Sequence, residues 1–504
     1  MRTVRHLLIT LFFGGVLLLC YCSSPEPTTA DRYTAVCGSC HLPPDPRELP
    51  KSVWSESVLP EMASRMGLQT YAYDPLAVIG EQEYTLAHAG GHYPDAPTIS
   101  YEVWEDVKAY ILAQAPDSLP LVPVPALAQL PSFTARTVAT EHKPGALVTY
   151  LDVSPQGVRV GDGYGSLYTI DTGGAVRDTL VQGRRPITHY AAAVGGDLVL
   201  EIGNMYPTED HNGALYRMGP DGRTVVADSL HRPVHLLVED LDRDGRQEIV
   251  VSEYGNYTGA LTLLQPDGAG AYERQRLSGS AGTIRVVARD MNADGRTDLV
   301  SMHAQGDEGI DVFYQSADGR FTRELLLQFS PVWGSSWFEL VDFDGDGDED
   351  ILTAHGDNAD YSNIRKPYHG IRLYENDGAN TFTLRYFYPL PGATRVVARD
   401  FDADGDMDLA VACNFADFAR APDAGFVYLE QTGGSDSLSF TARTTPAALD
   451  GRWLVLEAGD YDGDGDEDLA LGSFTLNPAP VPPGVAERWR RDSVDVLLLT
   501  NTLR

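Results

Sequence analysis

The sequence predicts two domains of different fold class, a small all-α domain followed by a larger all-β domain. Residues 31–115 place apolar side chains at helical spacing, whereas residues 132–504 alternate short apolar strands with Gly- and Asp-rich turns. The intervening residues 116–131 are rich in proline, which predicts an extended, semi-rigid linker. The β domain also repeats one aspartate-rich segment, so we expect an array of similar units.

Residues 1–22 have the pattern of a secretory signal. Two arginines precede an apolar run from Leu7 to Leu19, which is too short for an ordinary membrane span. Cys20 and Cys22 end the run and resemble the acylated cysteine of bacterial lipoproteins, although neither follows a small residue. We expect an exported, lipid-anchored protein of the periplasm or cell surface. The alternative is a soluble secreted protein whose signal cysteines are incidental.

Two cysteines and a histidine form the segment Cys37-Gly38-Ser39-Cys40-His41. This is the attachment pattern for one covalent haem c, with thioether bonds at Cys37 and Cys40 and His41 as the proximal iron ligand. A bare Cys-x-x-Cys also occurs in zinc sites and redox dithiols. No second thiol pair follows here, since the next cysteine is Cys413, and no βαβ pattern surrounds the segment. Export agrees with haem attachment.

Residues 31–115 therefore resemble a monohaem cytochrome c domain. A short helix is expected at 32–36, just before the haem motif, and a longer one at 100–114. In the longer helix Val103, Val107 and Tyr110 belong to one apolar stripe that would form a wall of the haem pocket. The resemblance implies electron transfer.

The sixth iron ligand is less well defined by the sequence. Pro60 suits the start of a short helix that would place Met62 and Met66 one turn apart on the same face. The resemblance favours a methionine, and we expect Met62, with Met66 second, although this ligand usually lies further from the haem motif. His88 and His92 are the rivals, and bis-histidine ligation would lower the potential.

Five segments of the second domain share one pattern, which begins at Asp240, Asp290, Asp342, Asp400 and Asp460. Their starts are 50, 52, 58 and 60 residues apart, close to the repeat length of propellers. Each has oxygen-bearing side chains at positions 1, 3, 5 and 9 and Gly at position 6, which suits a sharp turn around a hard cation. A main-chain carbonyl at position 7 would complete each site.

The pattern therefore predicts about five Ca²⁺ ions. An EF-hand would need Glu at position 12 and helical flanks, and a metal-free Asp-Gly hairpin would leave so many carboxylates in repulsion. The predicted ligands are Asp240, Asp242, Asp244, Glu248, Asp290, Asn292, Asp294, Asp298, Asp342, Asp344, Asp346, Asp350, Asp400, Asp402, Asp404, Asp408, Asp460, Asp462, Asp464 and Asp468.

These loops resemble the FG-GAP or VCBS repeats of calcium-binding β-propellers. The resemblance covers residues 132–504, strongly in five repeats and weakly at 146–171 and 190–218. Five plus two repeats predict an all-β propeller of seven blades. We expect 133–138 to supply the outer strand of the last blade, because ring closure removes exposed strand edges.

Two further sets of residues are weaker candidates for a site. One set stands five residues after each loop's ninth position, and it is more often ordinary variation than a site. It comprises Glu253, His303, His355, Cys413 and Ser473. The other set lies in a long insertion and comprises Tyr361, Arg365, Tyr368 and His369.

The net charge of −34 argues against nucleic acid as a partner, because phosphate contacts need Lys and Arg. It favours a basic redox partner through electrostatic steering. We expect an electron carrier whose propeller is a docking platform for a protein or glycan. The alternative is a cytochrome-linked dehydrogenase with a substrate site in the propeller. The sequence lacks a dinucleotide fingerprint, a nucleophile–base set and repeated quinoprotein tryptophans, which favours the non-enzymatic carrier.

Overall fold

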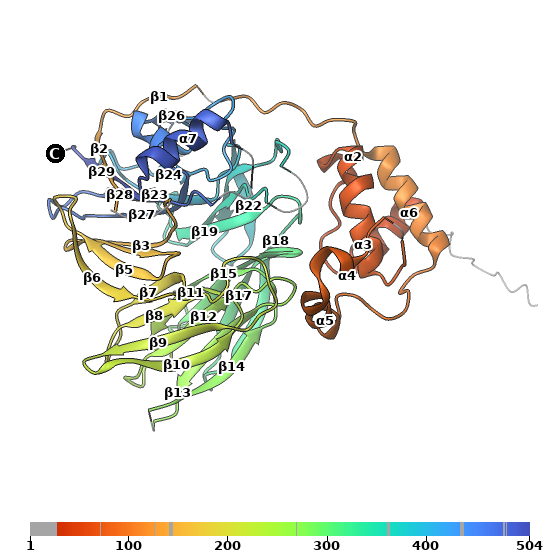
Figure 1. Cartoon of the computed structure of the whole chain (residues 1–504), viewed down its shortest axis with the longest axis horizontal. Coiled ribbons are helices and arrows are strands. Elements are labelled where there is room, and N and C mark those ends of the chain that lie inside the picture. Colours follow the sequence, from red (N-terminus) through yellow and green to blue (C-terminus); the bar gives the residue numbers. More distant parts are fainter. Residues whose placement is uncertain are drawn as a thin grey trace, which may run out of the picture.

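The computed structural model describes residues 28–503, apart from 71, 125, 141–144, 269, 360–362, 434–437, 477, 478 and 480. A small N-terminal helical region precedes seven sheets arranged in a ring (Figure 1). The predicted signal segment, with Cys20 and Cys22, lies outside the described residues. Within the described ranges, no helix has both the length and the apolar character needed to cross a membrane.

The helical region confirms the two predicted terminal helices with slightly different bounds. Thr28 and Asp31 form a capping box at the start of the first helix, and Ser100 caps the last. The elements are α1 (Thr29–Cys37), η1 (Pro46–Glu48), α2 (Lys51–Val53), the π-helical η2 (Trp54–Val58), α3 (Leu59–Arg65), α4 (Pro75–Ile79), α5 (Glu81–Ala89) and α6 (Tyr101–Gln114).

Helices α1 and α6 pack together. The rings of Tyr33 and Tyr110 lie 5.3 Å apart between centroids, and Arg32 forms a salt bridge to Asp106. Trp54, Trp104 and other apolar side chains fill a core of their own. The helical region therefore has a hydrophobic core of its own, against which Val332 and Ile364 of the propeller also pack.

The first three blades follow in chain order, with the innermost strand first. Blade 1 is β3 (Val148–Ser154), β4 (Gly157–Asp162), β5 (Ser166–Ile170) and β6 (Val176–Gln182). Blade 2 is β7 (Ile187–Ala191), β8 (Leu198–Glu201), β9 (Gly213–Gly219) and β10 (Gly222–Leu230). Blade 3 is β11 (Pro233–Glu239), β12 (Glu248–Glu253), β13 (Ala260–Pro266) and β14 (Tyr272–Ser278).

The remaining blades continue the same order. Blade 4 is β15 (Thr283–Arg289), β16 (Asp298–Gln305), β17 (Asp307–Gln315) and β18 (Phe321–Phe329). Blade 5 is β19 (Ser335–Val341), β20 (Asp350–His355), β21 (Gly370–Asn376) and β22 (Phe382–Pro389). Blade 6 is β23 (Arg395–Arg399), β24 (Asp408–Ala412), β25 (Phe426–Gln431) and β26 (Phe440–Thr444). Blade 7 is β27 (Trp453–Gly459), β28 (Asp468–Ser473) and β29 (Val496–Asn501), preceded in the chain by η3 (Pro446–Asp450) and interrupted by α7 (Pro483–Asp492).

The ring closes as the sequence predicts. Strand β2 (Phe133–Val138) pairs antiparallel with β29 and becomes the outer strand of blade 7. Innermost strands contact their neighbours around the ring, and β27 contacts β3 across the closure. The segment predicted as linker also contains β1 (Ala128–Gln129), which pairs in parallel with β26. Both N-terminal strands thus cover sheet edges that would otherwise be exposed.

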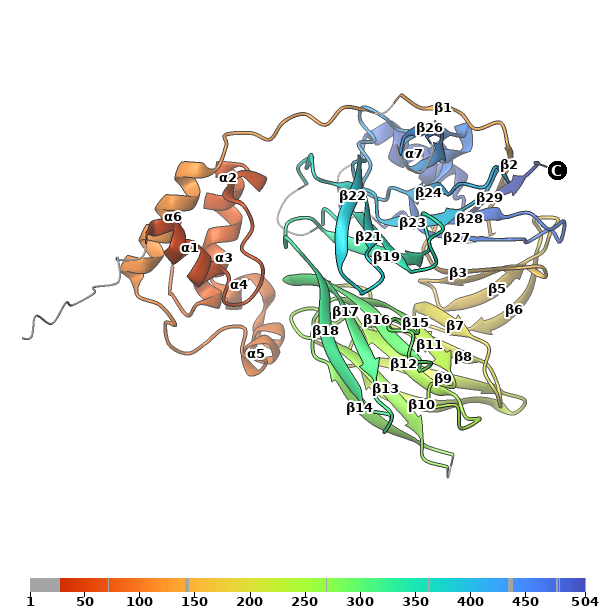
Figure 2. The same cartoon turned by 180° about the vertical axis from the view of Figure 1, so that it is seen from behind.

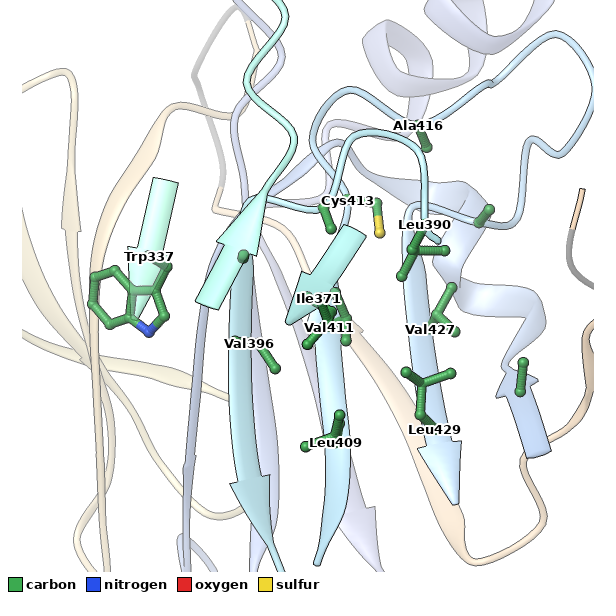
Figure 3. Close-up of a cluster of buried hydrophobic side chains, with 14 of the residues drawn as sticks. Trp337, Ile371, Leu390, Val396, Leu409, Val411, Cys413, Ala416, Val427 and Leu429 are labelled. Atoms are coloured by element: carbon green, nitrogen blue, oxygen red, sulfur yellow. The ribbon is translucent and has the colours of Figure 1, made fainter. Parts of the chain in front are cut away.

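Apolar side chains fill the spaces between blades. Figure 3 shows one such cluster, in which Ile371 of blade 5 lies beside Val411 of blade 6. The thiol of Cys413 belongs to this cluster, and its complete burial raises its pKa. Close packing between neighbouring blades stabilises the ring as a rigid frame.

Candidate metal loops and haem-attachment motif

All five aspartate-rich loops lie on one face of the propeller, which we term the metal-loop face. Each loop joins the first and second strands of a blade, from β11–β12 in blade 3 to β27–β28 in blade 7. Loops from second to third strands, and those between blades, therefore emerge on the opposite face, which we term the docking face.

Each loop folds around the carboxylate at its first position. In blade 3 the amide of Gly245 donates to Asp240 Oδ2 at 3.0 Å, and in blade 7 Gly465 donates to Asp460 Oδ2 at 3.0 Å. Gly245 has a φ of 89° and Gly465 a φ of 97°, a region that favours glycine. The glycine at position 6 is therefore required by the turn, as the sequence predicts.

In four loops, three carboxylates have oxygen atoms within 4.8 Å of one another. Burial and the neighbouring carboxylate of Asp464 raise the pKa of Asp462, which indicates a site short of positive charge. In the remaining loop, which begins at Asp290, the amide of Asn292 takes the place of one carboxylate. The groups are Asp240, Asp242 and Glu248; Asp342, Asp344 and Asp346; Asp400, Asp402 and Asp404; and Asp460, Asp462 and Asp464. These partly exposed groups are consistent with Ca²⁺ sites.

The ninth position has a role that the sequence pattern alone did not reveal. Asp298 is fully buried, and its two oxygens accept hydrogen bonds from the amides of Met291 and Gln315 at 3.0 and 2.8 Å. Asp468 makes the equivalent pair of bonds. Burial raises the pKa of Asp408 and of Asp468 to about 7. The ninth carboxylates tie the loops of blades 4 to 7 to the third strands of those blades. Glu248 of blade 3 is the one ninth residue that belongs to a converging carboxylate group of the described residues.

The predicted haem motif begins on the last residue of α1 and continues in the turn that follows. Cys37 is partly buried, which raises its pKa to about 12, whereas Cys40 is exposed, and neither is in a disulfide. His41 Nδ1 lies 2.9 Å from the carbonyl oxygen of Leu42. If Nδ1 donates this bond, Nε2 carries the lone pair that a metal requires. Two free thiols and such an imidazole fit covalent haem attachment.

An open cavity of about 220 Å³ lies beside the motif. Its lining consists of residues 38–43 on one side and Gln328, from β18 of the propeller, on the other. This volume is below the roughly 300–1,000 Å³ of most sites that enclose a small molecule. The cavity therefore offers room for only part of a haem, and none of the four predicted sixth ligands lines it.

The candidate sixth ligands have different surroundings. Met62 and Met66 pack against the same hydrophobic core as Cys37. His88 Nε2 lies 3.0 Å from Asp95 Oδ1, and the ring of His92 lies 5.7 Å from that of Tyr257 in the propeller. The methionines thus share a core with the haem motif, whereas both histidines contact other partners.

The helical region contacts the docking face, beside blades 2 to 5 (Figure 2). Glu48 accepts hydrogen bonds from Ser330 Oγ at 2.7 Å and from Trp333 Nε1 at 2.8 Å, and its carbonyl oxygen accepts one from Tyr368. On α5, Glu83 accepts the amide of Glu209 at 2.6 Å. Tyr368, a weak site candidate in the sequence, therefore contributes to the domain contact, while Tyr361 lies outside the described residues.

The five residues at the ends of the second strands are buried and do not form an exposed ring. Glu253 accepts the amide of His231 at 2.6 Å, and His355 Nδ1 lies 3.0 Å from Ser335 Oγ. The remaining three are His303, Cys413 and Ser473. Their variety reflects local hydrogen bonding and packing within blades, in agreement with ordinary variation.

Comparison with known families supports the repeat assignment. Residues 240–301 and 290–353 match the model of the FG-GAP-like repeat, and these two matches include the first three metal loops. Residues 240–353 are FG-GAP-like repeats in a seven-bladed β-propeller. The loops at Asp400 and Asp460 share the same blade position and converging carboxylates.

Two solved structures that match this chain are distant from it in sequence. The N-terminal domain of Nup159 is 11% identical, with a TM-score of 0.41, and the match covers 75% of this chain and 97% of that one. BBS1N, from its complex with ARL6DN, is 10% identical, with a TM-score of 0.43 and coverage of 73% and 99%. No curated protein matches the sequence significantly.

Proposed function

We propose that the protein is an exported haem c electron carrier whose calcium-stabilised propeller is a docking or ligand-binding platform. The observation that carries this proposal is the pair of free thiols, Cys37 and Cys40, followed by His41 beside an open cavity. A lone Cys-x-x-Cys has other uses, but the adjacent imidazole with its Nδ1 beside a carbonyl suits an iron ligand.

The residues of the helical region would divide the work of holding the group. Cys37 and Cys40 would anchor the macrocycle, and His41 would fix its orientation from one side. Met62, which packs against the same core as Cys37, remains our first choice for the opposite side, with Met66 second. The haem, when bound, supplies reversible one-electron transfer. The opening of the cavity would leave an edge that a partner can approach.

The propeller would support this task as a rigid platform. Ca²⁺ bound to the loops of the folded form alone would stabilise the ring by mass action. The excess of acidic residues favours a basic redox partner. A protein or glycan ligand would bind at the docking face or next to it. The N-terminal pattern supports export to the periplasm or cell surface with a lipid anchor.

Absorption spectroscopy after production in a host that matures c-type cytochromes tests the proposal. We expect the full chain to show a reducible haem spectrum that persists after denaturation, because the group is held covalently. Cys37→Ser combined with Cys40→Ser should remove it, whereas Cys413→Ser, at a buried thiol far from the motif in sequence, should retain it. A full chain without haem would contradict the proposal.

A further inference from the structure

The residue at position 7 divides the five metal loops into two kinds. In blades 3 and 4 it is an arginine, Arg246 or Arg296. In blades 5 to 7 it is an aspartate, namely Asp348, Asp406 or Asp466. The repeated loop pattern uses only the main-chain carbonyl at this position, so the pattern does not reveal the difference. The side chain at position 7 therefore adds charges of opposite sign to the two kinds of loop.

Each arginine holds the carboxylate at position 5 of its own loop. Arg246 Nε donates to Asp244 Oδ2 at 2.8 Å. In blade 4, Arg296 Nη2 donates to Asp294 Oδ2. Each guanidinium also donates to the carbonyl oxygen of the residue that ends a third strand, at 3.2 Å in β13 and at 2.7 Å in β17. A calcium ion at either loop would therefore compete with an anchored cation for the position 5 oxygen.

The carboxylates that converge within each loop reflect this pairing. In blades 5 to 7 they come from positions 1, 3 and 5. In blade 3 they come from positions 1, 3 and 9, and Asp244, which Arg246 holds, is not among them. In blade 4 the amide of Asn292 already replaces the charge at position 3. The two arginine loops thus depart from the carboxylate arrangement that the other three share.

The loops of blades 5 to 7 are open to a cation from solvent. In blade 5 the carboxylates of Asp344 and Asp346 are exposed. Asp342 beside them is partly exposed, and its Oδ1 has no hydrogen-bond partner among the described residues. Blades 6 and 7 each have two exposed carboxylates beside a partly exposed one as well. Converging carboxylates in a solvent-facing loop suit a hard cation such as Ca²⁺.

The two kinds of loop also differ in total charge. In blades 5, 6 and 7, positions 1, 3, 5, 7 and 9 hold five carboxylates. The same positions hold four carboxylates and a guanidinium in blade 3, and three carboxylates, an amide and a guanidinium in blade 4. Calcium affinity depends on the number of charged ligands, and the attraction of a divalent cation grows with the negative charge around it. The arginine loops should therefore bind calcium more weakly.

We propose that Arg246 and Arg296 weaken calcium binding in blades 3 and 4, so that the propeller has three strong calcium sites in blades 5 to 7 and two weak ones. This inference rests on the calcium binding in the proposed function and assigns its strength to particular blades. At blades 3 and 4 the guanidinium groups take over part of the role of the metal. Withdrawal of calcium would then loosen the contiguous blades 5 to 7 first.

Calorimetric titration of the calcium-free full chain with calcium chloride tests the number of affinity classes. We expect three equivalents to bind at least tenfold more tightly than the other two. Hydrogen–deuterium exchange with peptide resolution assigns each class to its blades. Residues 342–350, 400–408 and 460–468 should become protected at a calcium concentration at least tenfold lower than residues 240–248 and 290–298.

Matched variants separate the local pairing from the overall charge. Arg246→Gln frees the carboxylate of Asp244 and should lower the calcium concentration that protects residues 240–248 at least threefold. Arg243→Gln makes the same charge change at position 4, an exposed residue of the same loop, and should lower that concentration less than twofold. Calcium-dependent exchange of both variants provides the comparison.

The converse variant, Asp466→Arg, should weaken calcium binding at residues 460–468 at least tenfold. Five sites of equal affinity, or unchanged protection of residues 240–248 in Arg246→Gln, would overturn the inference and leave the calcium binding of the proposed function intact. A full chain that binds no calcium would contradict both. Haem attachment is tested separately by absorption spectroscopy, so its outcome is independent of these results.

Discussion

Single residues in the helical region carry the chemistry of the proposed iron site. Met62 and Met66 are one helical turn apart, yet only one of them can take the sixth position. Both pack against the core that includes Cys37, so burial does not distinguish them. Spectroscopy of matched variants is needed to show which of the two methionines binds the iron.

Met62→Ala should abolish the near-infrared charge-transfer band of methionine–iron ligation in the ferric protein, because the thioether is removed. Met66→Ala is the control and should retain the band. Near-infrared absorption of both purified variants provides the measurement. A band that survives in Met62→Ala and disappears in Met66→Ala would reassign the ligand to Met66.

His189 makes folding sensitive to acid. Burial, reinforced by Arg395 and Arg285, lowers its pKa to about 3, whereas the unfolded chain has a histidine pKa of about 6.5. Between pH 6 and pH 4 the unfolded state therefore binds the extra proton, so stability falls with falling pH by up to about 1.4 kcal/mol per unit from this group. Denaturant unfolding should show a shallower decline for His189→Gln. Identical slopes for His189→Gln and the parent would contradict this account, and exposed His211→Gln serves as control.

Short elements hold the helical region against the propeller. η1 places the carboxylate of Glu48 between Ser330 and Trp333, which belong to the connection between blades 4 and 5. A hydrogen bond to a charged group contributes about 1.5–3 kcal/mol to stability. The contact therefore sets how firmly the two parts are joined.

Glu48→Ala should loosen this contact, because Trp333 Nε1 and Ser330 Oγ lose their acceptors. We expect faster proteolysis of the segment 116–131 and a larger radius of gyration in solution scattering. Glu56→Ala, at an exposed position of η2, should change neither quantity. Unchanged proteolysis and scattering in Glu48→Ala would show that other contacts are sufficient to hold the helical region against the propeller.

The metal loops act as separate elements, one for each blade. Asp460→Asn removes the charge of the carboxylate around which the loop folds and should lower the calcium bound by one equivalent. Glu467→Gln makes the same charge change at position 8 of the same loop and should leave the stoichiometry unchanged. Equilibrium dialysis with calcium analysis distinguishes them. Equal stoichiometry in both variants would remove this loop from the set of sites.

At the scale of the whole molecule, features set by local sequence patterns could be predicted, whereas contacts between residues distant in the chain could not. The loops and the closure by β2 follow from repeated spacing along the chain, so their positions agree with the structure. The ring of His189 contacts those of Tyr150 and His235 from two other blades, and no local pattern connects these residues. The contact of Glu48 with Tyr368 joins residues 320 positions apart. Such contacts arise only when ring closure and domain docking bring distant segments together.

Calcium should stabilise the ring as a unit. Chelation should lower the melting temperature of the propeller, since each site held at 100 times its dissociation constant contributes about 2.7 kcal/mol. The haem spectrum should remain nearly unchanged, because the helical region has its own core. Differential scanning calorimetry and absorption on the same sample provide the test. Loss of haem ligation under mild chelation would show that the two parts are not independent.

Mass spectrometry of the full chain from a maturation-competent host tests the central claim most directly. The account predicts one added haem, located by peptide mapping on the segment that contains Cys37 and Cys40. Intact chains that carry no added group, from a host that matures a reference cytochrome in parallel, would contradict it.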